Sequence, residues 1–126
     1  LVLSSGHYDA YYKRARLLQR AIVSEFQTAF ESCDLIITPT TPTTAFRLGE
    51  KTQDPLEMYA ADICTVTLNI SGLPGVRIPC GFDEQNLPIA MQIIGPKFSE
   101  QRILSAAKAY EDAVGGFAVK EGQGHG

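Results

Sequence analysis

The run Leu35–Thr38 ("LIIT") constrains the fold most, because a continuous apolar and β-branched run predicts a short strand buried on both faces. Pro39 and Pro42 follow it and predict an extended loop. Such a strand needs helices on both faces and a strand at each edge. The sequence predicts two further strands, Val76–Cys80 and Ile89–Ile94. These are too few to provide both the neighbouring strands and the cover that the buried strand needs. We therefore expect the chain to form part of a larger sheet.

Three helices are predicted around these strands. Residues 8–33 carry apolar side chains three or four positions apart, which indicates a long amphipathic helix. Asp54 and Pro55 are typical of a helix start, as cap and first helical residue. Ser99 is expected to cap the last helix, which Gly115 and Gly116 end. The acidic stretch "GFDEQN" joins the last two strands as an antiparallel hairpin, so the fold class is α/β.

The run "CTVTLNI" before Gly72 is ambiguous. Its β-branched alternation is typical of a strand. A short helix that ends at Gly72 is equally compatible with the letters. The pattern taken alone favours the strand.

The bulk composition excludes several classes of protein. The chain has 126 residues, enough for one domain, and a net charge of -3, which gives no global basic field for nucleic acid. Its three cysteines form no CxxC pair, so we expect a reducing cytosol rather than disulfides or zinc. No apolar run suggests a membrane span or signal peptide, and the start "LVLSSGHYDAYY" resembles the interior of a longer chain.

Several familiar catalytic arrangements are not supported by the sequence. "SGLPGVRIP" leads into a strand instead of a helix, and Pro74 removes a donor, so it is not a phosphate cradle. The two histidines are His7 and His125, and nothing near His7 supports a nucleophile–histidine pair. No His, Asp and Glu cluster has the spacing of a metal site.

Asp62 is the candidate binding residue, because it lies among Tyr59, Ile63 and other apolar positions. A carboxylate buried in such a setting needs a partner. That partner is either a fixed group within the fold or the ammonium group of a ligand. The sequence physics leaves these two interpretations even.

Lys13, Arg16 and Arg20 form a basic stripe at helical spacing on the polar side of the first helix. The stripe could contact RNA or another protein chain. A solvated helix face is the favoured interpretation, since most charge runs on helices face water.

Four segments resemble the amidase signature family: "LSSGHYDAYYKRA", "DLIITPTTPTTAFRLGE", "DPLEMYAADICTVTLNISGLPGVRIPCG" and "LPIAMQIIGPKFSEQRIL". The likeness covers residues 1–114, while residues 115–126 form a polar tail that we expect to be mobile. The resemblance implies the C-terminal portion of a three-layer α/β/α sandwich with a mixed central sheet. It also implies that residues 65–70 are helical, that Gly72 ends this helix and that Pro74 leads into the next strand.

Within the family, the combination of "PTTPTTAF" and "DPLEMYAAD" is similar to the glutaminase (A) subunits of tRNA-dependent amidotransferases. The resemblance implies hydrolysis of glutamine, with Asp62 binding its α-ammonium group. The companion arginine for the α-carboxylate would precede Leu1. The family's Ser, cis-Ser and Lys catalytic residues are not matched in this sequence. Lys97 and Lys108 do not correspond to the family's catalytic lysine, and no Gly/Ser-rich loop occurs. No catalytic residue is therefore assigned, and the isolated chain is expected to be inactive.

The resemblance also implies partners, namely the B and C subunits of such an amidotransferase. Ammonia would pass to the B subunit, which uses ATP and Mg²⁺ to convert Glu-tRNA(Gln) or Asp-tRNA(Asn), and the small C subunit would clamp the assembly. This chain would itself bind no cofactor, metal or membrane, and would be cytoplasmic. The alternatives are another carboxamide amidase of the same family and a non-catalytic interaction module that uses the basic stripe.

Overall fold

The computed structural model describes residues 8–49 and 55–117. Helices and strands follow the predicted order, and their bounds are α1 (Tyr8–Phe30), β1 (Ile36–Pro39), α2 (Pro55–Ser71), β2 (Gly75–Phe82), β3 (Pro88–Ile94) and α3 (Glu100–Ala113). No helix within this described part is both long enough and apolar enough to cross a membrane.

The three strands form one antiparallel sheet in the order β1-β3-β2. Strands β2 and β3 form the predicted hairpin, with Val76 opposite Ile93 and Ile78 opposite Met91, and a bulge interrupts β2 between Pro79 and Gly81. Strand β1 lies antiparallel to the other edge of β3. Because β3 is central, it carries the side chains that can contact both helix layers.

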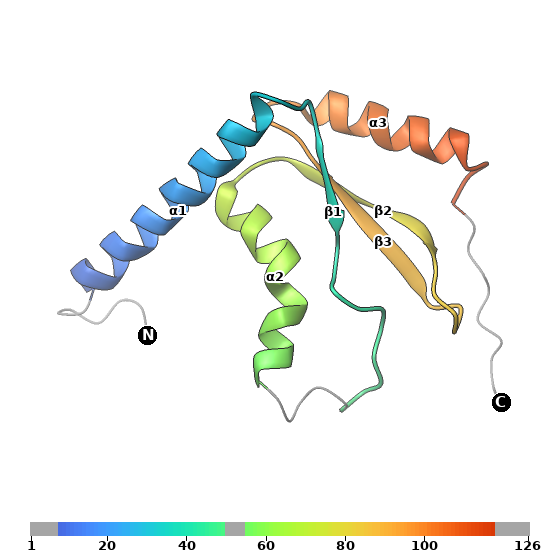
Figure 1. The fold of residues 1–126 in the computed structure, drawn as a ribbon, viewed down its shortest axis with the longest axis horizontal. Coiled ribbons are helices and arrows are strands. Elements are labelled where there is room, and N and C mark those ends of the chain that lie inside the picture. Colours follow the sequence, from blue (N-terminus) through green and yellow to red (C-terminus); the bar gives the residue numbers. More distant parts are fainter. Residues whose placement is uncertain (1–7, 50–54, 118–126) are drawn as a thin grey trace.

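The hydrophobic core lies between the sheet and α3. Ile78 and Ile93 on one sheet face pack against Ile103 and Ala107 of α3. The opposite sheet face carries Gln92 and looks toward α2, which packs beside α1. The described elements therefore form three layers, α3, the sheet, and the pair α1 and α2, as the α/β/α prediction required (Figure 1).

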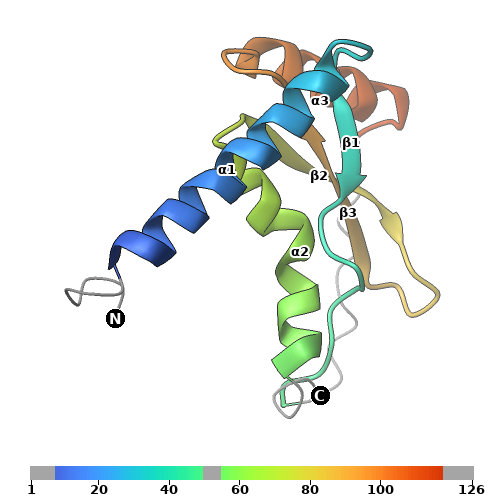
Figure 2. The same cartoon turned by 60° about the vertical axis from the view of Figure 1, so that its left-hand side comes forward.

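Helix α1 extends beyond this layered region. Its N-terminal half points away from the sheet in both views (Figures 1 and 2). The middle of α1 meets α2, where the Gln19 side-chain amide donates to the Ile70 carbonyl at 3.0 Å. The helix ends at Phe30, shorter than the predicted Cys33, and a turn follows in which the Glu31 N–H donates to the Thr28 carbonyl.

The prediction that Leu35–Thr38 is buried on both faces is wrong for this chain. The observed strand, Ile36–Pro39, is an edge strand with alternating half-buried and exposed residues. Ile37 points to the α3 side but is 63% exposed, because α3 packs on β2 and β3 instead. The expectation that this strand needs further cover remains consistent with its exposure.

Residues 65–70 are helical, so the strand favoured by pattern alone is wrong and the helix implied by the resemblance is confirmed. Gly72 follows the last helical residue with a φ of 66°, and its N–H donates to the Leu68 carbonyl. A left-handed residue at this place ends a helix and favours glycine. The Pro74 carbonyl then accepts from the Gly95 N–H at 3.1 Å, which starts the pairing of the next strand.

The ends of the other helices are partly as predicted. Helix α2 begins at Pro55 as expected, and its proposed cap Asp54 lies outside the described residues. Helix α3 follows Ser99, but the prediction of a side-chain cap is wrong: the Ser99 hydroxyl donates to the Pro96 carbonyl instead. The Ser99 carbonyl still accepts from the Ile103 N–H, so the backbone alone starts this helix.

Candidate functional site

Asp62 lies on the exposed surface of α2. Tyr59 and Val66 stand three positions before and four positions after it, which places the three side chains on one helical face. Tyr59 is 76% exposed and Val66 44% exposed. The apolar setting expected from the sequence is therefore present, as an open surface.

The expectation that Asp62 needs a partner because of burial does not apply in this chain, since the carboxylate is exposed. Within residues 8–49 and 55–117, no hydrogen bond or ion pair holds the Asp62 carboxylate. The assignment of Asp62 to a ligand's ammonium group stays a prediction. The described residues provide one wall for such a ligand.

The turn of α2 that carries Asp62 has an unusual set of backbone contacts. The Thr65 hydroxyl donates to the Asp62 carbonyl at 3.1 Å, and the Thr67 hydroxyl donates to the Ile63 carbonyl at 3.0 Å. The Gln92 amide donates to the Cys64 carbonyl at 2.7 Å. Three consecutive carbonyls thus accept side-chain hydrogen bonds, in addition to their place in the helix.

Gln92 is a residue that the sequence reasoning missed. It is 1% exposed, and its amide nitrogen also donates to the Thr38 hydroxyl at 2.8 Å. The available signal was a polar residue between Met91 and Ile93 in an otherwise apolar strand. A buried side-chain amide needs hydrogen-bond partners. The apolar neighbours of Gln92 in β3 have no polar side chains, so its partners come from β1 and α2.

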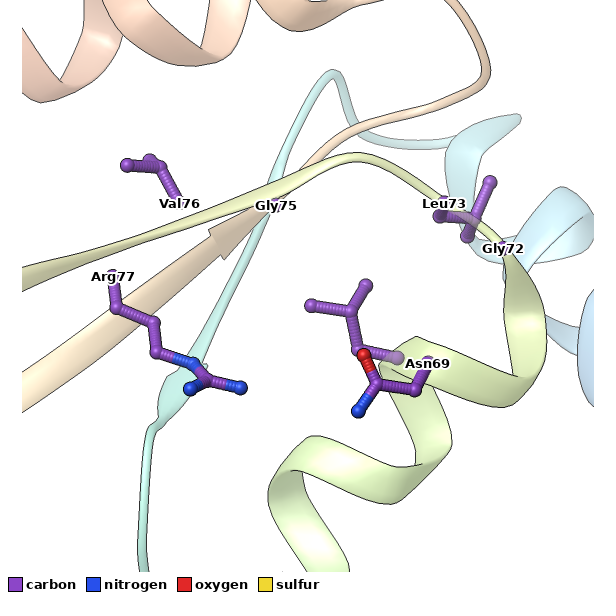
Figure 3. A pocket seen from close by; sticks show the side chains of 7 residues that line it. Asn69, Gly72, Leu73, Gly75, Val76 and Arg77 are labelled. Carbon is purple, nitrogen blue, oxygen red and sulfur yellow. The ribbon is translucent and has the colours of Figure 1, made fainter.

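A pocket of about 570 Å³ lies where α2 turns into β2. Its lining includes Asn69 and Leu68 of α2 and Arg77 of β2. Figure 3 shows the side chains of Asn69 and Arg77 pointing into the same space. Asp62 does not line this pocket, so the pocket and the predicted ligand residue are separate features.

The remaining candidates from the sequence have plain environments. Lys13, Arg16 and Arg20 are exposed on α1, and Arg16 donates to Gln19 at 2.9 Å. The three cysteines are free. Among the described residues, no three His, Cys, Asp or Glu side chains lie close enough to hold a metal ion. His7 and His125 lie outside these residues.

Comparison with known proteins identifies the class. The model of the Amidase family matches residues 1–104. The chain therefore belongs to the amidase family, in agreement with the resemblance carried by its motifs.

Curated relatives show which members of the amidase family this chain is similar to. The chain is 57% identical over 111 residues to a protein of Caldanaerobacter subterraneus subsp. tengcongensis named as the A subunit of glutamyl-tRNA(Gln) amidotransferase, covering 88% of the chain and 22% of the relative. It is 53% identical over 112 residues to the protein of the same name from Acaryochloris marina, covering 89% of the chain and 23% of the relative. The chain thus spans less than a quarter of the length of these curated relatives.

A solved structure supports the same relationship. The crystal structure of the glutamyl-tRNA(Gln) amidotransferase A subunit from Thermotoga maritima superimposes with a TM-score of 0.78 at 40% identity. The match covers 88% of this chain and 24% of that chain. The described arrangement is therefore that of a segment of an amidase α/β fold.

Proposed function

We propose that this chain is the C-terminal part of the glutamine-hydrolysing A subunit of a tRNA-dependent amidotransferase. The relatives named as the glutamyl-tRNA(Gln) amidotransferase A subunit support this at 53% and 57% identity. The observation that carries the proposal is Asp62, an exposed carboxylate without a described partner on an exposed apolar face of α2. Such a face binds an amino acid by pairing with its ammonium group while covering its methylene groups.

The chemistry of this wall is recognition. Free glutamine carries an ammonium group, and a simple carboxamide does not. A carboxylate that pairs with this ammonium group in a closed site gives a charge-assisted hydrogen bond, which is stronger than a neutral one. Asp62 therefore selects an α-amino acid amide over other amides. The nucleophile, the proton-transferring groups and the arginine for the α-carboxylate would come from residues outside this sequence.

The rest of the assembly follows from the same proposal. Glutamine hydrolysis would release ammonia to a B subunit, where ATP and Mg²⁺ would activate Glu-tRNA(Gln) or Asp-tRNA(Asn) for amidation. A small C subunit would hold the two larger subunits together. ATP, Mg²⁺ and tRNA would be bound by the partners, and the complex would work in the cytoplasm.

The test uses the full-length A subunit, purified with its partner subunits. Asp62→Ala removes the pair with the ammonium group, so the KM for glutamine should rise about 10- to 150-fold, the value of one hydrogen bond to a charged group. Thermal stability should stay close to the parent value, because no hydrogen bond or ion pair within the described residues depends on the carboxylate. Glu25→Ala, which removes an exposed carboxylate of α1, should leave the KM unchanged.

Three results would contradict the proposal. An unchanged KM in Asp62→Ala would remove Asp62 from the glutamine site. Hydrolysis of a simple carboxamide such as propionamide as readily as glutamine would favour another amidase of the family. If the full-length protein hydrolyses neither compound, the non-catalytic interaction module becomes the better interpretation.

A further inference from the structure

Gln92 occupies a position where an apolar residue would be expected. Its neighbours Ile93 and Ile94 are 2% exposed, and Gln92 itself is 1% exposed. An amide taken out of water needs hydrogen bonds to offset the lost hydration. The Gln92 side chain therefore either forms enough hydrogen bonds to stabilise the fold, or it has a role other than stability.

The hydrogen bonds of Gln92 do not satisfy the whole amide. The Cys64 carbonyl can only accept, so the amide nitrogen must face it. The Thr38 hydroxyl donates to the Pro39 carbonyl, so it accepts the second N–H of Gln92. Both N–H groups are then used, and the Gln92 Oε1 atom stays buried without a partner among the described residues.

An arrangement of this kind is poor for stability alone. A buried acceptor without a partner is unfavourable, and an apolar side chain of similar shape often avoids that loss. What the amide does supply is a directional link between three elements. It joins the Cys64 carbonyl of α2 to β3 and, through Thr38, to β1.

The link falls on the turn of α2 that carries Asp62, since Cys64 is two residues further along the helix. The Asp62 and Ile63 carbonyls of the same turn accept from hydroxyl groups of α2 itself. Of these three contacts, the one from Gln92 comes from outside the helix. It therefore fixes where this turn lies relative to the sheet, whereas the two threonine contacts act within the helix.

We propose that Gln92 is a positioning residue for Asp62: its amide holds the Cys64 carbonyl and so sets the place of the Asp62 carboxylate in the glutamine site. The proposal rests on the function proposed above. It assigns no contact between Gln92 and the substrate. Its effect is on the binding of the α-ammonium group.

The experiment compares two variants of neighbouring β3 residues in the full-length A subunit with its partners. Gln92→Met keeps the length of the side chain and removes both donors, so the KM for glutamine should rise about tenfold with kcat nearly unchanged, as expected for a displaced binding group. Ile93→Val is the matched control, because Ile93 is equally buried but faces α3. It should lower the melting temperature and leave the KM unchanged.

Two readouts separate positioning from general destabilisation. Glutaramate, the glutamine analogue without the α-amino group, should be hydrolysed with the same kcat/KM by Gln92→Met and the parent enzyme. In the background of Asp62→Ala, Gln92→Met should raise the KM for glutamine by less than about twofold, since coupled residues are not additive.

The outcomes are distinct from those of the functional test. If Asp62→Ala raises the KM and Gln92→Met does not, the positioning role is wrong and the glutamine site remains. If Gln92→Met lowers kcat/KM for glutamine and kcat/KM for glutaramate by the same factor, its effect is structural and the proposal is overturned. Should Gln92→Met fail to fold, Gln92→Asn keeps the amide but draws it one methylene away from Cys64, and the same KM and analogue measurements decide.

Discussion

The two sides of the sheet are covered very differently. On one side, Ile78 and Ile93 are buried against Ile103 and Ala107, and we call β1, β2, β3 and α3 the sheet–α3 unit. On the other side lie α1 and α2, here called the helix pair. Many large apolar side chains of the helix pair are exposed, among them Tyr11, Leu17, Leu18, Leu56, Tyr59, Ile63 and Val66.

The difference separates a region whose apolar core is covered from a region whose apolar surface is exposed. In the sheet–α3 unit, α3 buries the apolar face of β2 and β3, as an α/β core requires, while Ile37 of the edge strand β1 stays exposed. The helix pair leaves a broad apolar surface, of a kind that marks an interaction site in other proteins. The wall that carries Asp62 belongs to this open side. We expect that surface to be covered in the longer subunit.

The largest test of this comparison is a truncation inside the sheet–α3 core. Ile103→Ala should lower the free energy of unfolding of the chain by about 2–5 kcal/mol, the range for a large buried aliphatic side chain. Ile103 is 2% exposed. Urea denaturation followed by circular dichroism measures the change.

Two exposed leucines are the controls for this test. Leu104 follows Ile103 on α3, and Leu18 lies on α1 with 66% of its surface exposed. Alanine at either position should change the free energy of unfolding by less than about 0.5 kcal/mol. A loss at Leu18 as large as that at Ile103 would mean that the helix pair is packed in solution, and the comparison would fail. In the full-length subunit, Leu18→Ala should cost more than in this chain.

The next test falls on the junction between the two regions. Gly75 begins β2, and a Cβ atom there would lie 2.7 Å from Leu68 Cδ2 of α2. Gly75→Ala should therefore force the buried Leu68 side chain out of its rotamer where α2 meets the sheet, at a cost of about 1 kcal/mol. Gly81→Ala is the control, since nothing lies within 4 Å of its added Cβ. Equal losses for both variants would show that α2 is not held against the sheet at this point.

The same contrast explains which parts of the fold could be predicted. The hairpin of β2 and β3 follows from local alternation and a polar turn, so its pairing was predicted. The edge position of β1 depends on which other strands are present, and a run such as "LIIT" carries no such information. The exposure of Ile37 therefore could not be predicted from the run itself.

The segment around Thr65 and Thr67 failed in the pattern analysis for a local reason. Both residues are β-branched and favour a strand by propensity. In α2 their hydroxyls donate to carbonyls three and four residues earlier, which makes them compatible with a helix. Asp62 was proposed as a binding residue from the sequence and stays a prediction, whereas the link from Gln92 joins residues 28 positions apart and needed the structure.

The smallest expected effect concerns the turn between β2 and β3 in the sheet–α3 unit. The Asp83 carboxylate accepts from the Leu87 and Gln85 N–H groups, both at 2.8 Å, and from the Thr44 hydroxyl at 2.7 Å. These hydrogen bonds, that from Leu87 first and that from Thr44 next, lower the pKa of Asp83 below its ordinary value. The ionised side chain thus ties the hairpin turn to the loop that follows β1.

A lowered pKa in the folded state fixes the sign of the pH dependence. The stabilisation is complete above the ordinary pKa of an aspartate, about 4, and is lost as the pH falls through the lower folded value. Asp83→Asn keeps the shape and removes the titration, so its urea midpoint should fall less than that of the parent chain between pH 6 and pH 3. Glu84→Gln, at the exposed neighbour, should retain the parent's acid response. Identical acid responses of the parent and Asp83→Asn would show that the turn is held by its backbone alone, and the loop after β1 would then belong with the open side of the molecule.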